Sequence, residues 1–301
     1  YGPQWRPDRS TSGSVSAWLV GTAAGGRIMN HLPEDFIFSQ SSLQDYVDCP
    51  RRFQLKYLLR QRYPAPEVDD LLEFERRMAQ GERFHHLLHQ HAVGLPAEVL
   101  QKRIDDDEVR RWFDTYMANG LSDVPERRYP EYSLTVPLGD YRLLAKFDLL
   151  ALSEDKALII DWKTSRHVPR RDRLQRRLQT IVYRYVLAKG GTALNGGQPI
   201  PPEQIEMRYW YADHEGQVVA FAYDAAQFEA DEHYLTSLVS EIESRERFPL
   251  TDDTTRCAYC TYRSLCERGI TAGPLDEWEL DEPTDLDELD FDFDQIAEIE
   301  F

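Results

Sequence analysis

The sequence predicts a mixed α/β domain built around a small sheet, with helices before, between and after its strands. Apolar residues recur at helical intervals up to about residue 118, and apolar runs or a two-residue period dominate residues 132–160. Helical and strand-like segments then alternate as far as residue 243. The chain has 301 residues, of which 42% are hydrophobic, so it is long enough to bury a large core.

The first part of the chain is expected to be helical. Ser39 or Ser41 can cap a helix that continues to about residue 59, because apolar residues follow at helical spacing. A second helix is expected over residues 71–91 and a third over residues 108–118.

Strands are expected next, over residues 132–136, 141–152 and 157–160, with the polar residues 153–156 as a hairpin turn between the last two. A helix over 174–189 then precedes strands over 205–211 and 217–223. A last helix is expected over residues 225–243.

The two ends differ in composition from this middle part. Residues 1–30 are rich in Gly and Ser and are expected to form a flexible extension, with Met29 as a candidate natural start. Residues 31–270 form the expected domain, and residues 271–301 an acidic disordered tail. No apolar run approaches the roughly 20 residues of a membrane span. No targeting signal is visible, so we expect a cytoplasmic protein.

The formal net charge of −18 argues against a nucleic-acid partner only if it is spread over the whole chain. Residues 276–301 carry thirteen carboxylates and no Lys or Arg, which leaves −5 for the rest of the chain. Charge therefore does not exclude DNA as a partner. The tail either remains solvated, docks on a partner or competes with DNA for basic residues.

The four cysteines suggest a metal centre. Cys257, Cys260 and Cys266 form a C-x2-C-x5-C cluster, and Cys49 lies about two hundred residues upstream. Disulfides are not expected in a chain without a secretory signal. Four thiolates on one metal centre explain the pattern better than scattered core thiols, but zinc and an iron–sulfur cluster both accept four cysteines. Such a centre would pin the C-terminal segment to the first helix.

Acidic residues and a lysine mark the neighbouring strands. Asp161 and Lys163 follow the strand 157–160 and point to the same side, and Asp148 interrupts the apolar strand before it. The hairpin can bring the two carboxylates together as a site for a hard divalent ion. With a lysine beside them, that set suits phosphodiester hydrolysis. The alternative is a buried Asp–Lys ion pair.

Two further groups surround this candidate site. His85 and His89 share one helix face and can reach a metal or pack in the core. Six arginines follow Lys163 and are interpreted as a track for a phosphate backbone, with a solvated helix face as the alternative. They are Arg166, Arg170, Arg171, Arg173, Arg176 and Arg177.

In this order the motifs resemble those of the PD-(D/E)XK nuclease superfamily, in particular the branch with the RecB/AddB-type nuclease domain and the CRISPR-adaptation exonucleases. The resemblance covers about residues 38–268. It rests on the segments Ser39–Leu43 and Cys49–Phe53, on Gly81 and His85 as a G-x-x-x-H motif, on Asp148, on Asp161-Trp162-Lys163-Thr164 as a D-x-K-T core, on Gln179 and Tyr183 as a Q-x-x-x-Y motif, and on the terminal cysteines.

The resemblance implies a restriction-endonuclease-like core, a small mixed sheet flanked by helices, with a helical region stapled by a [4Fe–4S] cluster. It implies that His85, or its neighbour His86, holds Mg2+ or Mn2+ with Asp148, Asp161 and the Trp162 carbonyl. Lys163 would orient water or stabilise the transition state, while Gln179 and Tyr183 would position DNA or brace the site.

The implied activity is that of a metal-dependent DNA exonuclease, acting on single strands or strand ends in repair, recombination or CRISPR adaptation. The sequence contains no G-x-x-x-x-G-K-[ST] loop, so any motor would come from a helicase or another repair or CRISPR protein as partner. Two rival hypotheses are a non-catalytic DNA- or protein-binding module stabilised by a four-cysteine metal centre, and a zinc-stapled protein of unrelated function.

Overall fold

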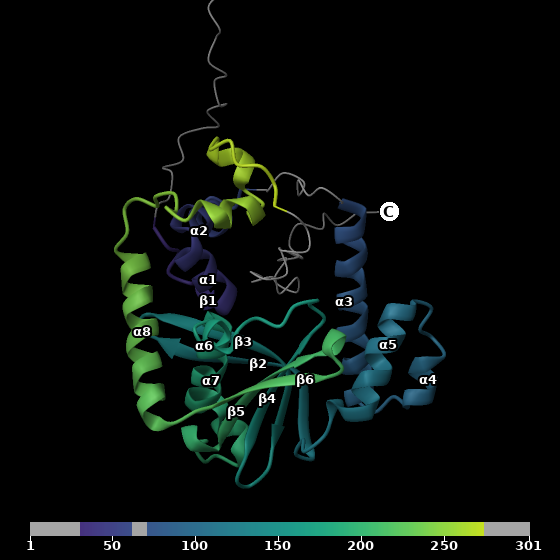
Figure 1. The fold of residues 1–301 in the computed structure, drawn as a ribbon. Helices are drawn as coiled ribbons and strands as arrows, with labels where there is room; N and C mark the ends of the chain where they lie inside the picture. The colour runs from purple at the N-terminus through teal and green to yellow at the C-terminus, as the bar shows by residue number, and fades with distance from the viewer. Residues whose placement is uncertain (1–30, 62–70, 274–301) are drawn as a thin grey trace, which may run out of the picture.

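The computed structural model describes residues 31–61 and 71–273, which form a mixed sheet with helices on both faces (Figure 1). The strands are β1 (Ile37–Ser39), β2 (Arg127–Leu138), β3 (Tyr141–Leu152), β4 (Ala157–Lys163), β5 (Ile205–Tyr211) and β6 (Gln217–Ala222). The α-helices are α1 (Gln40–Asp48), α2 (Pro50–Phe53), α3 (Leu71–Ala92), α4 (Ala97–Gln101), α5 (Asp107–Thr115), α6 (Arg171–Gln175), α7 (Leu178–Gly190) and α8 (Ala225–Glu243). The predicted mixed α/β class is confirmed, and the architecture is consistent with a restriction-endonuclease-like core.

Strand β3 organises the sheet. Strand β2 pairs with it in antiparallel fashion along almost its whole length. Its other edge is shared by two strands, because β1 pairs in parallel with residues 142–144 and β4 pairs in antiparallel fashion with residues 149–152. The strands β5 and β6 then extend the sheet beyond β4. Residues 145–148 of β3 therefore lie where β1 and β4 separate.

The two faces of the sheet carry separate hydrophobic cores. On one face α7 and α8 pack on the sheet, and Val182 and Leu235 are fully buried there. On the other face α3 and α5 pack, and Phe84 and Phe113 are fully buried. Because apolar residues of β4 alternate between these cores, this strand is buried on both sides, as its continuous apolar run requires.

The first helices begin and break where the sequence requires. The Ser39 side chain accepts a hydrogen bond from Ser42 N, and the Ser42 hydroxyl accepts one from Ser39 N, which closes a capping box. The expected single helix to residue 59 breaks at Cys49, whose backbone is extended because Pro50 follows. Proline then occupies the first position of α2, where its missing N–H costs nothing.

The structure corrects several predicted elements. The helix expected over 174–189 is divided into α6 and α7, because Arg177 has an extended backbone and the Gln44 side chain accepts a hydrogen bond from Leu178 N. Strand β2 is longer than residues 132–136. The sequence analysis missed β1 and α4, which have only three and five residues.

Parts of the predicted organisation lie outside the described residues. These are the flexible extension 1–30 with Met29, and the acidic tail from residue 274 onward. None of the described helices combines the length and hydrophobicity that a bilayer span requires.

The Asp106 cap offers a test of how α5 is held. Its carboxylate accepts hydrogen bonds from Glu108 N and Val109 N, and a further one from the Gln80 amide on α3. We predict that Asp106→Ala destabilises the fold by about 1 kcal/mol, the usual contribution of a cap. Thermal unfolding should show a lower midpoint than in an Asp107→Ala control, whose exposed side chain lies in the first turn of α5. Equal midpoints would contradict this role of Asp106.

Candidate active site

Asp148 and Asp161 lie where β3 and β4 separate. The ladder between these strands ends at the pair Leu149–Ile160, so the next residue on each strand is one of the two acids. Beyond that pair, Trp162 N donates a hydrogen bond of 2.8 Å to Asp148 Oδ2. The side chain of Asp148 thus accepts a hydrogen bond from the β4 backbone. The register places the two acids that the strand pattern predicted on facing positions of β3 and β4.

Asp161 is a buried carboxylate with positioned partners. Its side chain is 2% exposed, Lys163 Nζ lies 2.9 Å from Oδ2, and Gln179 Nε2 donates a 2.7 Å hydrogen bond to Oδ1. A buried charge without such partners would cost several kcal/mol. The i, i+2 spacing of Asp161 and Lys163 on β4 and the position of Gln179 on α7 supply both contacts. Gln179 therefore braces the acid in this structure.

His85 reaches the site from α3. Its Nδ1 lies 3.6 Å from Asp148 Oδ2, and its side chain is 29% exposed. Burial opposes the charged imidazole, but Asp148 outweighs it and raises the pKa of His85 to about 9. Burial likewise opposes ionisation of Asp148, yet His85, Lys163 and the Trp162 N–H hold its pKa below the usual value. His86, one residue on, pairs with Gln90 instead.

Gly81 explains how α3 can approach the end of β4 so closely. A Cβ atom at this position would lie 3.3 Å from Thr164 Oγ1, which is tighter than an ordinary contact. The first residue of the G-x-x-x-H motif therefore gives room to the last residue of the D-x-K-T motif. One turn farther along the helix, His85 faces the carboxylates.

The side chains of Trp162 and Tyr183 pack in the core beside the candidate active site. The Trp162 ring is buried against Tyr116 and Trp210, at centroid distances of 5.4 Å each, so its backbone is the part that faces Asp148. Tyr183 is buried with its ring 4.9 Å from that of Phe147. This contact lies beside Asp148 in sequence, but it belongs to the core.

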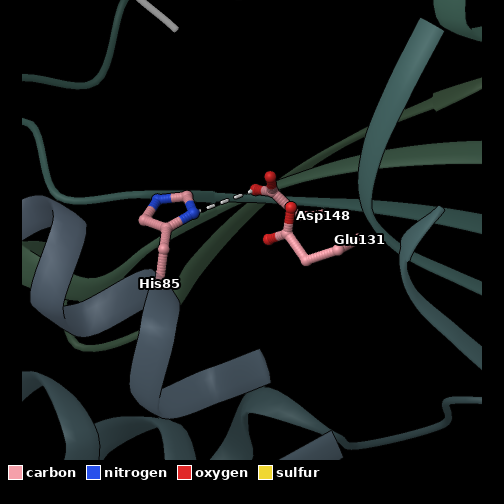
Figure 2. Close-up of side chains that lie close together, drawn as sticks. All are labelled: His85, Glu131 and Asp148. Atoms are coloured by element: carbon pink, nitrogen blue, oxygen red, sulfur yellow. Dashed lines mark ion pairs between the residues drawn. The ribbon is translucent and has the colours of Figure 1, made fainter. Parts of the chain in front are cut away.

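Glu131 is a site residue that the sequence analysis missed. His85, Glu131 and Asp148 each offer one ligand atom, and these atoms all lie within 4.8 Å of one another (Figure 2). The three side chains come from α3, β2 and β3. The available signal was an acid directly before the strand predicted over residues 132–136. Among the described residues, this set fits a divalent cation, since carboxylate oxygens and imidazole nitrogen are suitable ligands.

Three of the six arginines after Lys163 form ion pairs with nearby acids, and a fourth packs on an aromatic ring. Arg170 and Arg176 both pair with Asp172, at 3.2 and 3.3 Å. The Arg166 guanidinium lies 3.6 Å from Glu73, and Arg171 lies over the Phe221 ring. The side chains of Arg170 and Arg176 are 87% and 74% exposed.

The four cysteines meet at one pocket. Cys49, Cys257, Cys260 and Cys266 all line it. In Figure 1 the yellow-green C-terminal segment lies beside α1 and α2, which flank Cys49. The predicted convergence of the first helices and the C-terminal cysteines is thus present in the fold.

The surroundings of this pocket are basic. Arg52, Arg256, Arg263 and Arg268 also line it, and Arg268 Nη1 lies 3.6 Å from Cys257 Sγ. Burial raises the pKa of the Cys260 thiol to about 11. A thiolate there therefore needs more positive charge than these arginines supply, and a bound metal centre would provide it.

An ion-pair network anchors the same region. Arg52 lies 2.7 Å from Asp45 and 2.8 Å from Asp48, both on α1. Arg256, on the C-terminal cysteine segment, pairs with Asp48 as well. The first helix and the cysteine segment are thus joined by buried carboxylates in addition to any metal.

Comparison with known proteins places these features in a family. The model of the PD-(D/E)XK nuclease superfamily matches residues 37–267. The structure of SSO0001 is 15% identical, with a TM-score of 0.37, over 80% of this chain and 91% of that chain. A structure from Eubacterium rectale named "Putative exonuclease" is 11% identical, with a TM-score of 0.48, over 83% of this chain and 94% of that chain. No curated protein matches.

The family match spans most of the chain, and it includes every residue of the carboxylate site and all four cysteines. The chain belongs to the PD-(D/E)XK nuclease superfamily.

Proposed function

We propose that this protein is a metal-dependent deoxyribonuclease that hydrolyses phosphodiester bonds. The observation that carries the proposal is the meeting of Asp148, Asp161 and Lys163 at the point where β3 and β4 separate. Two buried or half-buried carboxylates with a lysine fit a divalent ion acting on a phosphate. Nucleases of this superfamily typically use Mg2+ or Mn2+.

Each residue of the candidate active site has a proposed role. His85, Asp148, Asp161 and the Trp162 carbonyl would hold the ion, which activates water and neutralises phosphate charge when bound. Lys163 places its ammonium beside Asp161, where it can stabilise negative charge on a phosphoryl oxygen. Gln179 fixes the orientation of Asp161 through its hydrogen bond. Tyr183 would keep the strand of Asp148 in place by packing on Phe147.

We further propose that the four cysteines hold a [4Fe–4S] cluster of structural role. The residues fit a metal centre, because four cysteines line one pocket with arginines around it. Four cysteine thiolates are the usual ligands of such a cluster.

The finer assignments follow the resemblance to the RecB/AddB-type and CRISPR-adaptation branch. They are exonuclease action on single-stranded DNA or strand ends, a role in repair, recombination or CRISPR adaptation, and cooperation with a helicase or other partner in the cytoplasm. The exposed Arg170 and Arg176 support a phosphate contact beside the site, with the other arginines of the track as additional contacts. Residues 31–270 would form the nuclease domain.

Cleavage assays test the carboxylate site directly. We predict that Asp161→Asn and Lys163→Met each lower the cleavage rate of end-labelled DNA by about 10^3-fold, since the first weakens the hold on the ion and the second removes the ammonium that stabilises the phosphoryl oxygen. Single- and double-stranded substrates should be compared under anaerobic conditions with Mg2+ and Mn2+. An Asp155→Asn control in the exposed β3–β4 turn should cleave normally.

Thermal unfolding of the same variants would establish that they remain folded. Undiminished cleavage by folded Asp161→Asn and Lys163→Met proteins would contradict the proposed site. Wild-type protein that binds DNA but cuts it with neither metal would instead favour a non-catalytic binding module.

Metal content tests the cysteine centre. Anaerobically purified protein should be brown and contain about four irons per chain. Cys49→Ser should lower the iron content and the visible absorbance, because it removes the ligand that α1 and α2 contribute. A Ser264→Ala control within the C-terminal segment should retain the iron. A colourless protein with one zinc per chain would contradict the cluster and favour a zinc staple.

A further inference from the structure

Glu131 lies directly opposite Asp148 in the sheet. The neighbouring residues are paired as Pro130 with Leu149 and Tyr132 with Phe147, so the register brings the two acids face to face. Like charges at directly opposed positions of an antiparallel pair are destabilising. This juxtaposition therefore needs a cation that offsets the repulsion.

The backbone at Glu131 departs from the strand. Its φ is +50° within the twelve-residue β2, a left-handed conformation that is unfavourable for a non-glycine residue. Pairing with β3 resumes in the same register on both sides. The departure is thus confined to the residue that faces Asp148, and Figure 2 shows the Glu131 carboxylate beside that of Asp148.

Lys146 supplies a cation at this position. Its Nζ lies 2.9 Å from Glu131 Oε2, and it sits two residues before Asp148 on β3, so both side chains emerge from the same face of that strand. The Lys146 side chain is 46% exposed, and that of Glu131 is 23% exposed. Because nearly half of the lysine side chain is exposed, its ammonium can extend toward solvent when it leaves Glu131.

We propose that Glu131 is a ligand of the divalent cation at the candidate active site, and that Lys146 is a displaceable counter-ion that occupies its carboxylate in the absence of the ion. Glu131, Asp148 and His85 already place their ligand atoms within 4.8 Å of one another. The ammonium and the divalent ion compete for one carboxylate, so binding of the ion releases Lys146. This inference rests on the proposed function for the identity of the site's ion.

Calorimetric titration with Mn2+ tests both halves without any cleavage. Glu131→Gln keeps the shape of the side chain and removes its charge, and it should weaken Mn2+ binding by about tenfold or more. Lys146→Met removes the competitor, and it should tighten binding by about fivefold, as expected for one partly exposed ion pair. In a Glu131→Gln background, Lys146→Met should have no further effect.

Lys156→Met is the matched control, because Lys156 forms a similar half-exposed pair with Glu206 at the far end of β4. It should leave Mn2+ affinity unchanged. Unchanged affinity in Glu131→Gln would overturn the ligand role. If Lys146→Met increased Mn2+ affinity equally in the wild-type and Glu131→Gln proteins, the exchange would be overturned. Such a result would indicate only a long-range charge effect.

If Glu131→Gln does not fold, the Lys146→Met single variant still tests the exchange. Unchanged Mn2+ affinity in Lys146→Met would overturn it. Failure of the proposed function would appear differently. The wild-type protein would bind Mn2+ with the predicted variant pattern but cut no DNA.

Discussion

The site depends on how one edge of β3 is divided between two partners. Strand β1 takes residues 142–144 and β4 takes residues 149–152, so the polar groups at the junction must be satisfied by something other than a ladder. The Asp148 carboxylate does so by accepting Trp162 N. The same divergence exposes Asp161 to Lys163 and Gln179. The charged side chains of Asp148, Asp161 and Lys163 are therefore held in place beside the point where β3 and β4 separate.

The cysteine pocket lies where the two ends of the described chain meet. Asp48 pairs with both Arg52 and Arg256, so ion pairs as well as the four cysteines connect the first helices to the C-terminal segment. Buried ion pairs of this kind are costly to break from one side. A metal centre in the pocket would further stabilise the contact between the first helices and the C-terminal segment, which the ion pairs already hold together.

The sequence alone identified the acids and the lysine, because a charged residue at the end of an apolar strand is conspicuous. It also identified the cysteines and most of the long elements, among them α3, β3, β5 and α8. It missed β1, which is only three residues long, and the break at Arg177, which depends on a hydrogen bond from Leu178 to Gln44 on a distant helix. Glu131 escaped for the same reason, because its relation to Asp148 comes from register and a local backbone departure.

We propose that the divergence of β3 and β4 creates a divalent-cation site. Anomalous scattering from crystals soaked in Mn2+ tests it most directly, because the signal locates the ion itself. We expect a peak about 2.2 Å from carboxylate oxygens of both Asp148 and Asp161. A fully occupied manganese site elsewhere in the molecule, with no peak at these two acids, would contradict it.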